Sequence, residues 1–222
     1  MPEDERKKLR VVGIRMIGYY NYSVILTYVG LASSIIGITE VFRGGYKWAL
    51  LCLIISGTCD MFDGKIARAM KNRSAEAKVF GIEIDSLCDL ICFGVLPGLF
   101  AYNLCPNRVL GTAAAIVFVL AAVIRLGYFN VKEQLRQQQT TEHRKYYQGL
   151  PVTSISMILP SFYIIQRLIG TNLIPDICYS ILLFIVAFLN VFDFKVKKPG
   201  NVGCIIMTIY GIAMLAGVLF VK

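Results

Sequence analysis

The sequence predicts an all-α membrane protein, a polytopic bundle of about seven transmembrane helices. Hydrophobic residues make up 56% of the chain, charged residues only 17%, and the mean hydropathy is +0.63. Soluble domains carry about 25% charged residues, so this composition favours a membrane protein. The apolar residues form long runs with short polar stretches between them. The 222 residues are therefore expected to form a single membrane domain over 1–222.

Seven apolar segments account for this prediction. Most are long enough to cross a hydrocarbon layer of about 30 Å at about 1.5 Å per residue. Residues 1–20, charged at first and then mixed, are expected to form an amphipathic juxtamembrane segment at the membrane surface. The polar tract 134–148 is expected to extend the fourth segment as a surface helix or to form a cover. The seven segments are 22–42, 46–63, 81–104, 109–131, 151–170, 174–192 and 202–221.

Basic residues occur in alternate loops and predict an orientation. They crowd the N-terminal stretch and the loops after the second, fourth and sixth segments, while the opposite loops hold few. This asymmetry predicts a multi-pass protein of the cell membrane with a cytoplasmic N-terminus and with the 60–89 stretch facing the cytoplasm. The same loops explain the net charge of +9. Because the charges form no continuous stripe, no nucleic-acid partner is expected.

Four aspartates between residues 60 and 89 are the strongest candidates for chemistry. Asp60 and Asp63 are three residues apart and Asp85 and Asp89 are four apart, so each pair shares a helix face. The first pair closes the second segment and the second pair opens the third, so the pairs can meet across a helical hairpin. A carboxylate within a transmembrane helix costs about 2.5–3.5 kcal/mol, so the cluster needs compensation. Oxygen ligands favour Mg²⁺, Mn²⁺ or Ca²⁺.

Nearby residues add to this pattern. Gly64 and Gly81 would let a ligand or a neighbouring backbone come close, and Arg68 could grip a phosphate. The alternative is that the aspartates cap helices or pair with loop lysines. The seven cysteines form no CxxC pair, and they are interpreted as small buried apolar residues.

The spacing of these residues resembles the motif of the CDP-alcohol phosphatidyltransferases. The matching positions are Asp60-x-x-Asp63-Gly64-x-x-Ala67-Arg68 and Gly81-x-x-x-Asp85-x-x-x-Asp89. Twelve residues separate Arg68 from Gly81, which is longer than the common family spacing by about one helical turn. The resemblance implies a six-helix family core, here with one helix more, and a homodimer.

The resemblance also implies roles for individual residues. Asp60, Asp63, Asp85 and Asp89 would hold two Mg²⁺ or Mn²⁺ ions, and Asp89 would act as general base. The CDP part of CDP-diacylglycerol would bind among residues of the first three segments, with its lipid tails in the bilayer. The CDP-binding residues implied in this way are Thr27, Asp60, Gly64, Ala67, Arg68 and Gly81.

Further stretches resemble the phosphatidylserine synthase branch of the family and imply L-serine as the acceptor. They are DSLCDLICFGVLPG (85–98), AAVIRLGYFNV (121–131) and YQGLPV (147–152). An arginine at a helix end in the membrane is costly, so Arg125 is a candidate ligand of the serine carboxylate or the lipid phosphate. The alternative is an arginine that snorkels to the headgroups. Asn130 and Gln148 are weaker acceptor-binding candidates.

Two other functions remain open at this stage. Within the family, the acceptor could be glycerol 3-phosphate, inositol phosphate, inositol or choline, and basic residues of the connector could serve a phosphorylated acceptor. Outside it, intramembrane aspartates also mark ion paths, so a cation transporter is the competing class. The transporter is disfavoured because the acidic pairs gather at one side, with no matching acidic set opposite.

Overall fold

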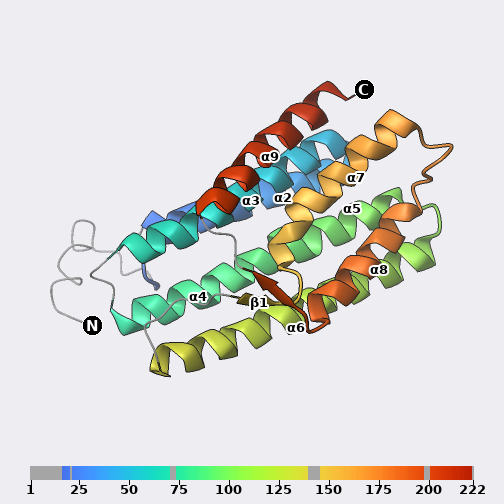
Figure 1. The fold of residues 1–222 in the computed structure, drawn as a ribbon. Coiled ribbons are helices and arrows are strands. Elements are labelled where there is room, and N and C mark those ends of the chain that lie inside the picture. The colour runs from blue at the N-terminus through green and yellow to red at the C-terminus, as the bar shows by residue number, and fades with distance from the viewer. Residues whose placement is uncertain (1–16, 21, 71–73, 140–145, 198–200, 222) are drawn as a thin grey trace.

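A computed structural model describes residues 17–20, 22–70, 74–139, 146–197 and 201–221. Within these residues, seven helical rods lie side by side in one elongated bundle, which confirms the all-α prediction (Figure 1). Residues 1–16 of the expected amphipathic segment lie outside the described part of the chain. The rods are α2 (Tyr22–Phe42), α3 (Tyr46–Ala69), α4–η2–α5 (Ala75–Asp89, Leu90–Val95, Leu96–Leu104), α6 (Arg108–Gln139), η3–α7 (Val152–Ser154, Ile155–Ile169), α8 (Cys178–Val191) and α9 (Asn201–Phe220).

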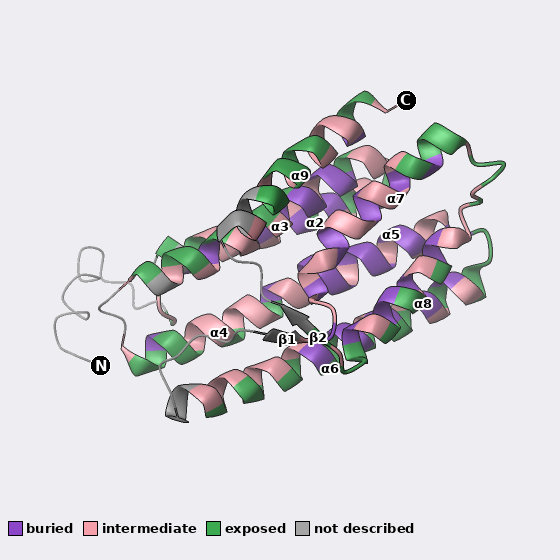
Figure 2. Ribbon diagram, viewed as in Figure 1, coloured by how far each residue is buried: buried purple, intermediate pink, exposed green. Residues whose placement is uncertain are grey.

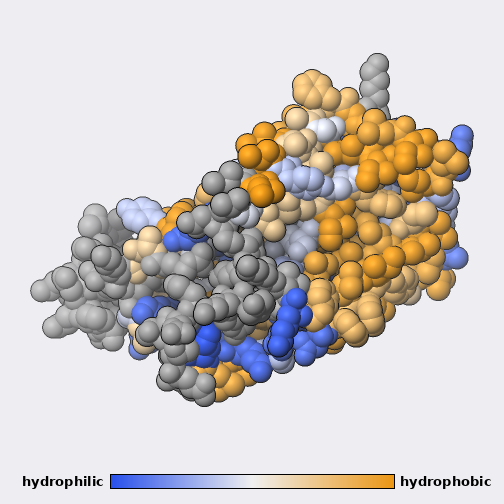
Figure 3. All heavy atoms as spheres, in the orientation of Figure 1, coloured by the Kyte–Doolittle hydropathy of each residue, from blue (hydrophilic) through white to orange (hydrophobic). Residues whose placement is uncertain are grey.

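The rods have the apolar surface of a multi-pass membrane protein. By length and composition, Val24–Phe42, Arg108–Arg136 and Val152–Ile169 can each cross a membrane, and α8 and Ile206–Phe220 are shorter apolar helices. Hydrophobic side chains cover most of the visible surface over α5, α7 and α8, whereas hydrophilic ones gather toward the end where α6 projects (Figure 3). The end of α3, the start of α4 and the end of α6 lie together at that end (Figure 1).

The third rod changes its helical type midway. The N–H of Leu96 donates to the carbonyl of Ile91, a bond that spans five residues and marks the π-helix η2. Pro97 has no N–H to offer the carbonyl of Phe93, so the ordinary α pattern is interrupted there. The rod nevertheless remains continuous from Ala75 to Leu104.

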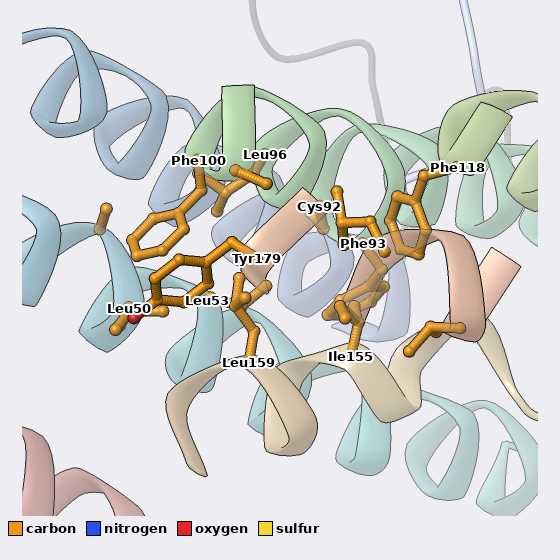
Figure 4. Packing of buried hydrophobic residues seen from close by; sticks show 14 of the residues in the cluster. Leu50, Leu53, Cys92, Phe93, Leu96, Phe100, Phe118, Ile155, Leu159 and Tyr179 are labelled. Carbon is orange, nitrogen blue, oxygen red and sulfur yellow. The ribbon is translucent and has the colours of Figure 1, made fainter. Parts of the chain in front are cut away.

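A buried core joins the rods in the middle of the bundle (Figures 2 and 4). Phe100 is 1% exposed, and its ring meets those of Tyr46, Tyr179 and Tyr163 edge to face at centroid distances of 5.5, 5.6 and 6.5 Å. Such aromatic contacts stabilise beyond the area that they bury. The core fixes the part of the third rod that follows η2.

Two local features differ from the sequence prediction, and one agrees with it. Helix α8 begins at Cys178, not near residue 174, because the preceding turn is held by Gln166, whose amide donates to the Ile174 carbonyl and to Asp176 Oδ1. Helix α6 continues to Gln139, as expected of a surface extension. Two short strands that we did not predict, β1 (Tyr146–Gln148) and β2 (Lys195–Lys197), pair antiparallel.

Candidate active site

The two aspartate pairs meet between α3 and α4. Asp60, Asp85 and Asp89 each offer a carboxylate oxygen, and these oxygens all lie within 4.8 Å of one another. None of the three residues is exposed. The hairpin of α3 and α4 therefore brings together carboxylates that are up to 29 residues apart in the sequence (89 − 60).

This cluster carries a concentration of negative charge. Two unit charges 4 Å apart repel by about 4 kcal/mol at the effective dielectric constant of about 20 that suits protein sites. Within the described part of the chain, Asp60, Asp85 and Asp89 make no hydrogen bond or ion pair. Lys65, on the same helix, lies over the ring of Phe62 at 5.2 Å. Three close carboxylates with no cation paired to them among the described side chains are a donor set that fits a hard divalent cation.

Asp63 has a different environment from the other three aspartates. It is 5% exposed, and its Oδ2 accepts a hydrogen bond of 2.7 Å from the hydroxyl of Thr27 on α2. Thr27 and Asp63 are 36 residues apart. Helix α2 thus helps to orient the second carboxylate of α3, and the structure brings two of the predicted site residues into direct contact.

A small cavity runs beside the carboxylates between α2, α3 and the third rod. Its floor includes small residues, since a Cβ added at Gly30 would lie only 3.2 Å from Cys59 Cβ. Gly30 and Ser56 were not predicted as site residues because no sequence motif marks them, and the cysteines were interpreted only as small apolar residues. The residues that line the cavity are Thr27, Gly30, Ser56, Cys59, Asp60, Asp63, Cys88, Asp89, Cys92 and Phe93.

The other predicted CDP-binding residues continue the same two helices. Gly64, Ala67 and Arg68 follow Asp63 on α3, and Gly81 precedes Asp85 by four residues on α4. The side chain of Arg68 lies outside the described part of the structure. Their binding roles stay predictions.

Arg125 is buried at the junction of α6, α8 and the segment after β1. It is 7% exposed, and its Nη1 donates to the carbonyls of Gln148 and Asn190 at 2.8 and 3.0 Å. Its Nη2 donates to the carbonyl of Gly149 at 3.4 Å, and its guanidinium lies 4.6 Å from the ring of Phe129. These contacts make Arg125 a clamp between segments, and its role as an acceptor ligand stays a prediction.

Asn130 and Gln148 also have protein partners. Asn130 contacts Ser86 and Glu83 on α4, and the hydroxyl of Tyr128 donates to Gln148 Oε1 at 3.1 Å. Neither residue lines the described cavity beside the aspartates. The structure therefore brings Thr27 and the aspartates together, whereas the acceptor-side candidates Arg125 and Asn130 lie on α6 and Gln148 lies on β1.

The sequence that forms this site matches a known family of enzymes. The model of the CDP-alcohol phosphatidyltransferase family matches residues 20–192, which include every rod except α9. The chain belongs to this family. Its four aspartates and their glycines occupy the matched region.

The chain is also similar to individual proteins, which include the following three. The chain is 36% identical over 117 residues to the CDP-diacylglycerol–serine O-phosphatidyltransferase of Saccharomyces cerevisiae, a match that covers 51% of this chain and 41% of the yeast protein. It is 28% identical over 177 residues to the protein of the same name from Methanocaldococcus jannaschii, a match that covers 80% of this chain and 75% of that protein. It is 28% identical over 141 residues to the archaetidylserine synthase of Methanothermobacter thermautotrophicus, covering 63% and 56%. The chain thus spans less than half the length of the yeast relative.

Proposed function

We propose that this protein transfers the phosphatidyl group of CDP-diacylglycerol to L-serine, which gives phosphatidylserine and CMP. The observation that carries the proposal is the cluster of Asp60, Asp85 and Asp89 in a chain of this family. The serine acceptor is supported by the names of the bacterial, archaeal and yeast relatives, all of which include serine.

The proposed reaction is a displacement at phosphorus. The serine hydroxyl oxygen forms a bond to the phosphorus on the lipid side of the pyrophosphate, and the bond from that phosphorus to the CMP oxygen breaks. Asp89 takes the proton of the attacking hydroxyl, which requires the hydroxyl to sit within hydrogen-bond reach of its carboxylate. CMP leaves with the bonding electron pair.

The carboxylates of Asp60, Asp63, Asp85 and Asp89 would hold the divalent cations, Mg²⁺ or Mn²⁺. Bound there, two such ions would supply Lewis-acid stabilisation of the pyrophosphate charge. Thr27 supports this role of Asp63, because its hydroxyl fixes one carboxylate oxygen at 2.7 Å.

The substrates would approach from two sides of the cluster. The CDP moiety would lie along α3 and α4, next to Thr27, Gly64, Ala67, Arg68 and Gly81. The serine would reach Asp89 from the side of α6, where Arg125 and Gln148 are candidates for contact with its carboxylate. The burial of Arg125 among backbone carbonyls supports an indirect contribution as well, through the segment that it clamps.

The setting of the enzyme follows from the same features. We place the site at the cytoplasmic face of the cell membrane, since the basic loops lie at the ends of α3 and α6. We also propose that residues 1–222 act as one membrane domain and assemble as a homodimer. Cross-linking of the protein in native membranes tests the dimer, and a monomer at all cross-linker concentrations would contradict it.

The decisive experiment is an acceptor screen with the purified protein. CDP-diacylglycerol, Mn²⁺ or Mg²⁺ and one alcohol at a time are supplied, and CMP and lipid product are measured. Serine-dependent release of CMP with formation of phosphatidylserine is expected. If CMP is released with glycerol 3-phosphate, inositol phosphate, inositol or choline but not with serine, that alcohol is the acceptor and the proposal of serine is wrong. Ion flux in liposomes without any CMP would instead support a transporter.

A further inference from the structure

Helix α4 bears two of the aspartates but has little apolar anchoring. Of its 15 residues, only Ala77 and Cys88 are buried. Figure 2 shows most of α4 as intermediate or exposed, whereas the region around α5 is largely buried. The rotation of α4 is set in part by its continuity with η2 and α5, and polar contacts with neighbouring helices can reinforce it. This rotation matters because Asp85 and Asp89 can meet Asp60 only when α4 presents one particular face to α3.

A polar contact between α4 and α6 provides such a reinforcement. Asn130 Oδ1 accepts a hydrogen bond from the Ser86 hydroxyl at 2.8 Å, and Asn130 Nδ2 donates to Glu83 Oε2 at 3.4 Å. Gln134, one turn further along α6, donates to Glu83 Oε1 at 3.0 Å. We call Glu83, Ser86, Asn130 and Gln134 the α4–α6 clasp.

The clasp and the aspartates use different faces of α4. At about 100° per residue, Glu83 and Ser86 point on average about 110° away from Asp85 and Asp89 around the helix. A rotation of α4 by one residue would therefore break the clasp and turn both carboxylates away from Asp60. The clasp therefore fixes the rotation of α4 about its axis, which is the rotation that brings Asp85 and Asp89 to Asp60.

We propose that Asn130 is a positioning residue that holds α4, and with it Asp85 and Asp89, in register with α3. This inference deepens the proposed function and assigns Asn130 a role other than contact with serine. Asparagine suits the position because its amide both accepts from Ser86 and donates to Glu83. A carboxylate in its place would accept from Ser86 but face the carboxylate of Glu83.

The test is a substitution together with its chemical rescue. Asn130→Asp is expected to lower kcat and to raise the Mn²⁺ concentration for half-maximal activity by about tenfold, the effect of about 1.4 kcal/mol from a lost hydrogen bond and a new repulsion. The KM for serine is expected to stay unchanged. Adding Glu83→Gln to Asn130→Asp should restore both quantities to within about threefold, because the introduced amide can donate to the introduced carboxylate.

A second measurement does not depend on activity. Hydrogen–deuterium exchange of the metal-free protein is expected to show faster exchange across Ala75–Asp89 in Asn130→Asp and a return toward wild type in the double variant. Exchange within α5 should stay unchanged in both. This measurement tests the clasp even if the acceptor screen shows that serine is not the substrate.

The matched control is Asn103→Ala. Asn103 Oδ1 also accepts a hydrogen bond between helices, from the hydroxyl of Tyr46 at 3.0 Å, but it lies near the end of α5, on the other side of η2 from the aspartates of α4. This variant should leave α4 exchange and the Mn²⁺ dependence as in wild type. Equal effects in both variants would overturn the proposal. A raised KM for serine in Asn130→Asp, with no rescue by Glu83→Gln, would also overturn it and make Asn130 an acceptor ligand.

Discussion

The two halves of the third rod hold their places by opposite means. After η2, α5 is anchored by buried apolar contacts, with Phe100 at 1% exposure among three tyrosine rings. Before η2, α4 has two buried residues and is joined to α6 by hydrogen bonds. The apolar half buries its side chains in the core, whereas the acidic half places carboxylates close together. The two ends of this rod are therefore held by different kinds of contact.

The largest expected effect is a loss of activity without a loss of stability when the acidic half is changed. Asp89→Asn should lower kcat by about 10³-fold, within the range of 10²–10⁴ expected for a general base. The thermal stability of the metal-free variant should equal or exceed that of wild type, because one of the repelling charges is gone. CMP release and thermal unfolding in detergent measure the two quantities. Activity above a tenth of wild type would remove Asp89 from the role of base.

Phe100→Ala should give the converse result. Truncation of a buried phenylalanine costs about 3–5 kcal/mol of unfolding free energy, because it leaves a cavity among the rings of Tyr46, Tyr163 and Tyr179. The melting temperature should fall, while kcat per folded molecule and the Mn²⁺ dependence remain near wild type. If the Mn²⁺ dependence shifts as much as in Asn130→Asp, the two halves are not independent.

Addition of metal should stabilise the acidic half specifically. At a Mn²⁺ concentration about 100 times its Kd, binding to the native state contributes about 2.7 kcal/mol to stability. Thermal unfolding of wild type with Mn²⁺ and with a chelator measures this difference. Asp60→Asn should remove most of it, and Phe100→Ala should keep it although its baseline is lower. A shift of the same size in Asp60→Asn would place the cation elsewhere.

The smallest expected effect concerns the turn that Arg125 clamps. Gly149 has φ of 67°, and an added Cβ would lie 2.8 Å from Arg125 Nη1 and 2.9 Å from the Phe192 carbonyl oxygen. Gly149→Ala should therefore destabilise by about 1–2 kcal/mol, the cost of a left-handed backbone for a residue with a Cβ. Gly127→Ala is the control, since nothing lies within 4 Å of its added Cβ and alanine favours a helix. Equal melting temperatures for the two variants would contradict the clamp.

The sequence was sufficient to predict the apolar helices and the cluster of buried carboxylates. Seven apolar segments gave the seven rods, because length and hydropathy are local properties. The spacing of Asp60, Asp63, Asp85 and Asp89 predicted that the pairs could meet, because the helix period and the cost of buried charge both act on single segments.

The remaining features depend on contacts between segments distant in sequence. Nothing near Asn130 indicates that its partners are Glu83 and Ser86, which lie 47 and 44 residues away. The late start of α8 depends on Gln166, and the pairing of β1 with β2 joins residues about 50 apart. Such pairings are set by tertiary packing, which a single sequence does not encode as a periodic pattern.

The π-turn at Leu90–Val95 lets α4 and α5 present different faces of one continuous rod to their neighbours. One residue beyond the α repeat rotates everything downstream by about 100° relative to a straight α-helix. Without it, Asp89 could face α3 only if Phe100 left its tyrosine partners, or the reverse. Removal of any single residue between 90 and 95 would force that choice, so the length of this short stretch matters more than the identity of its side chains.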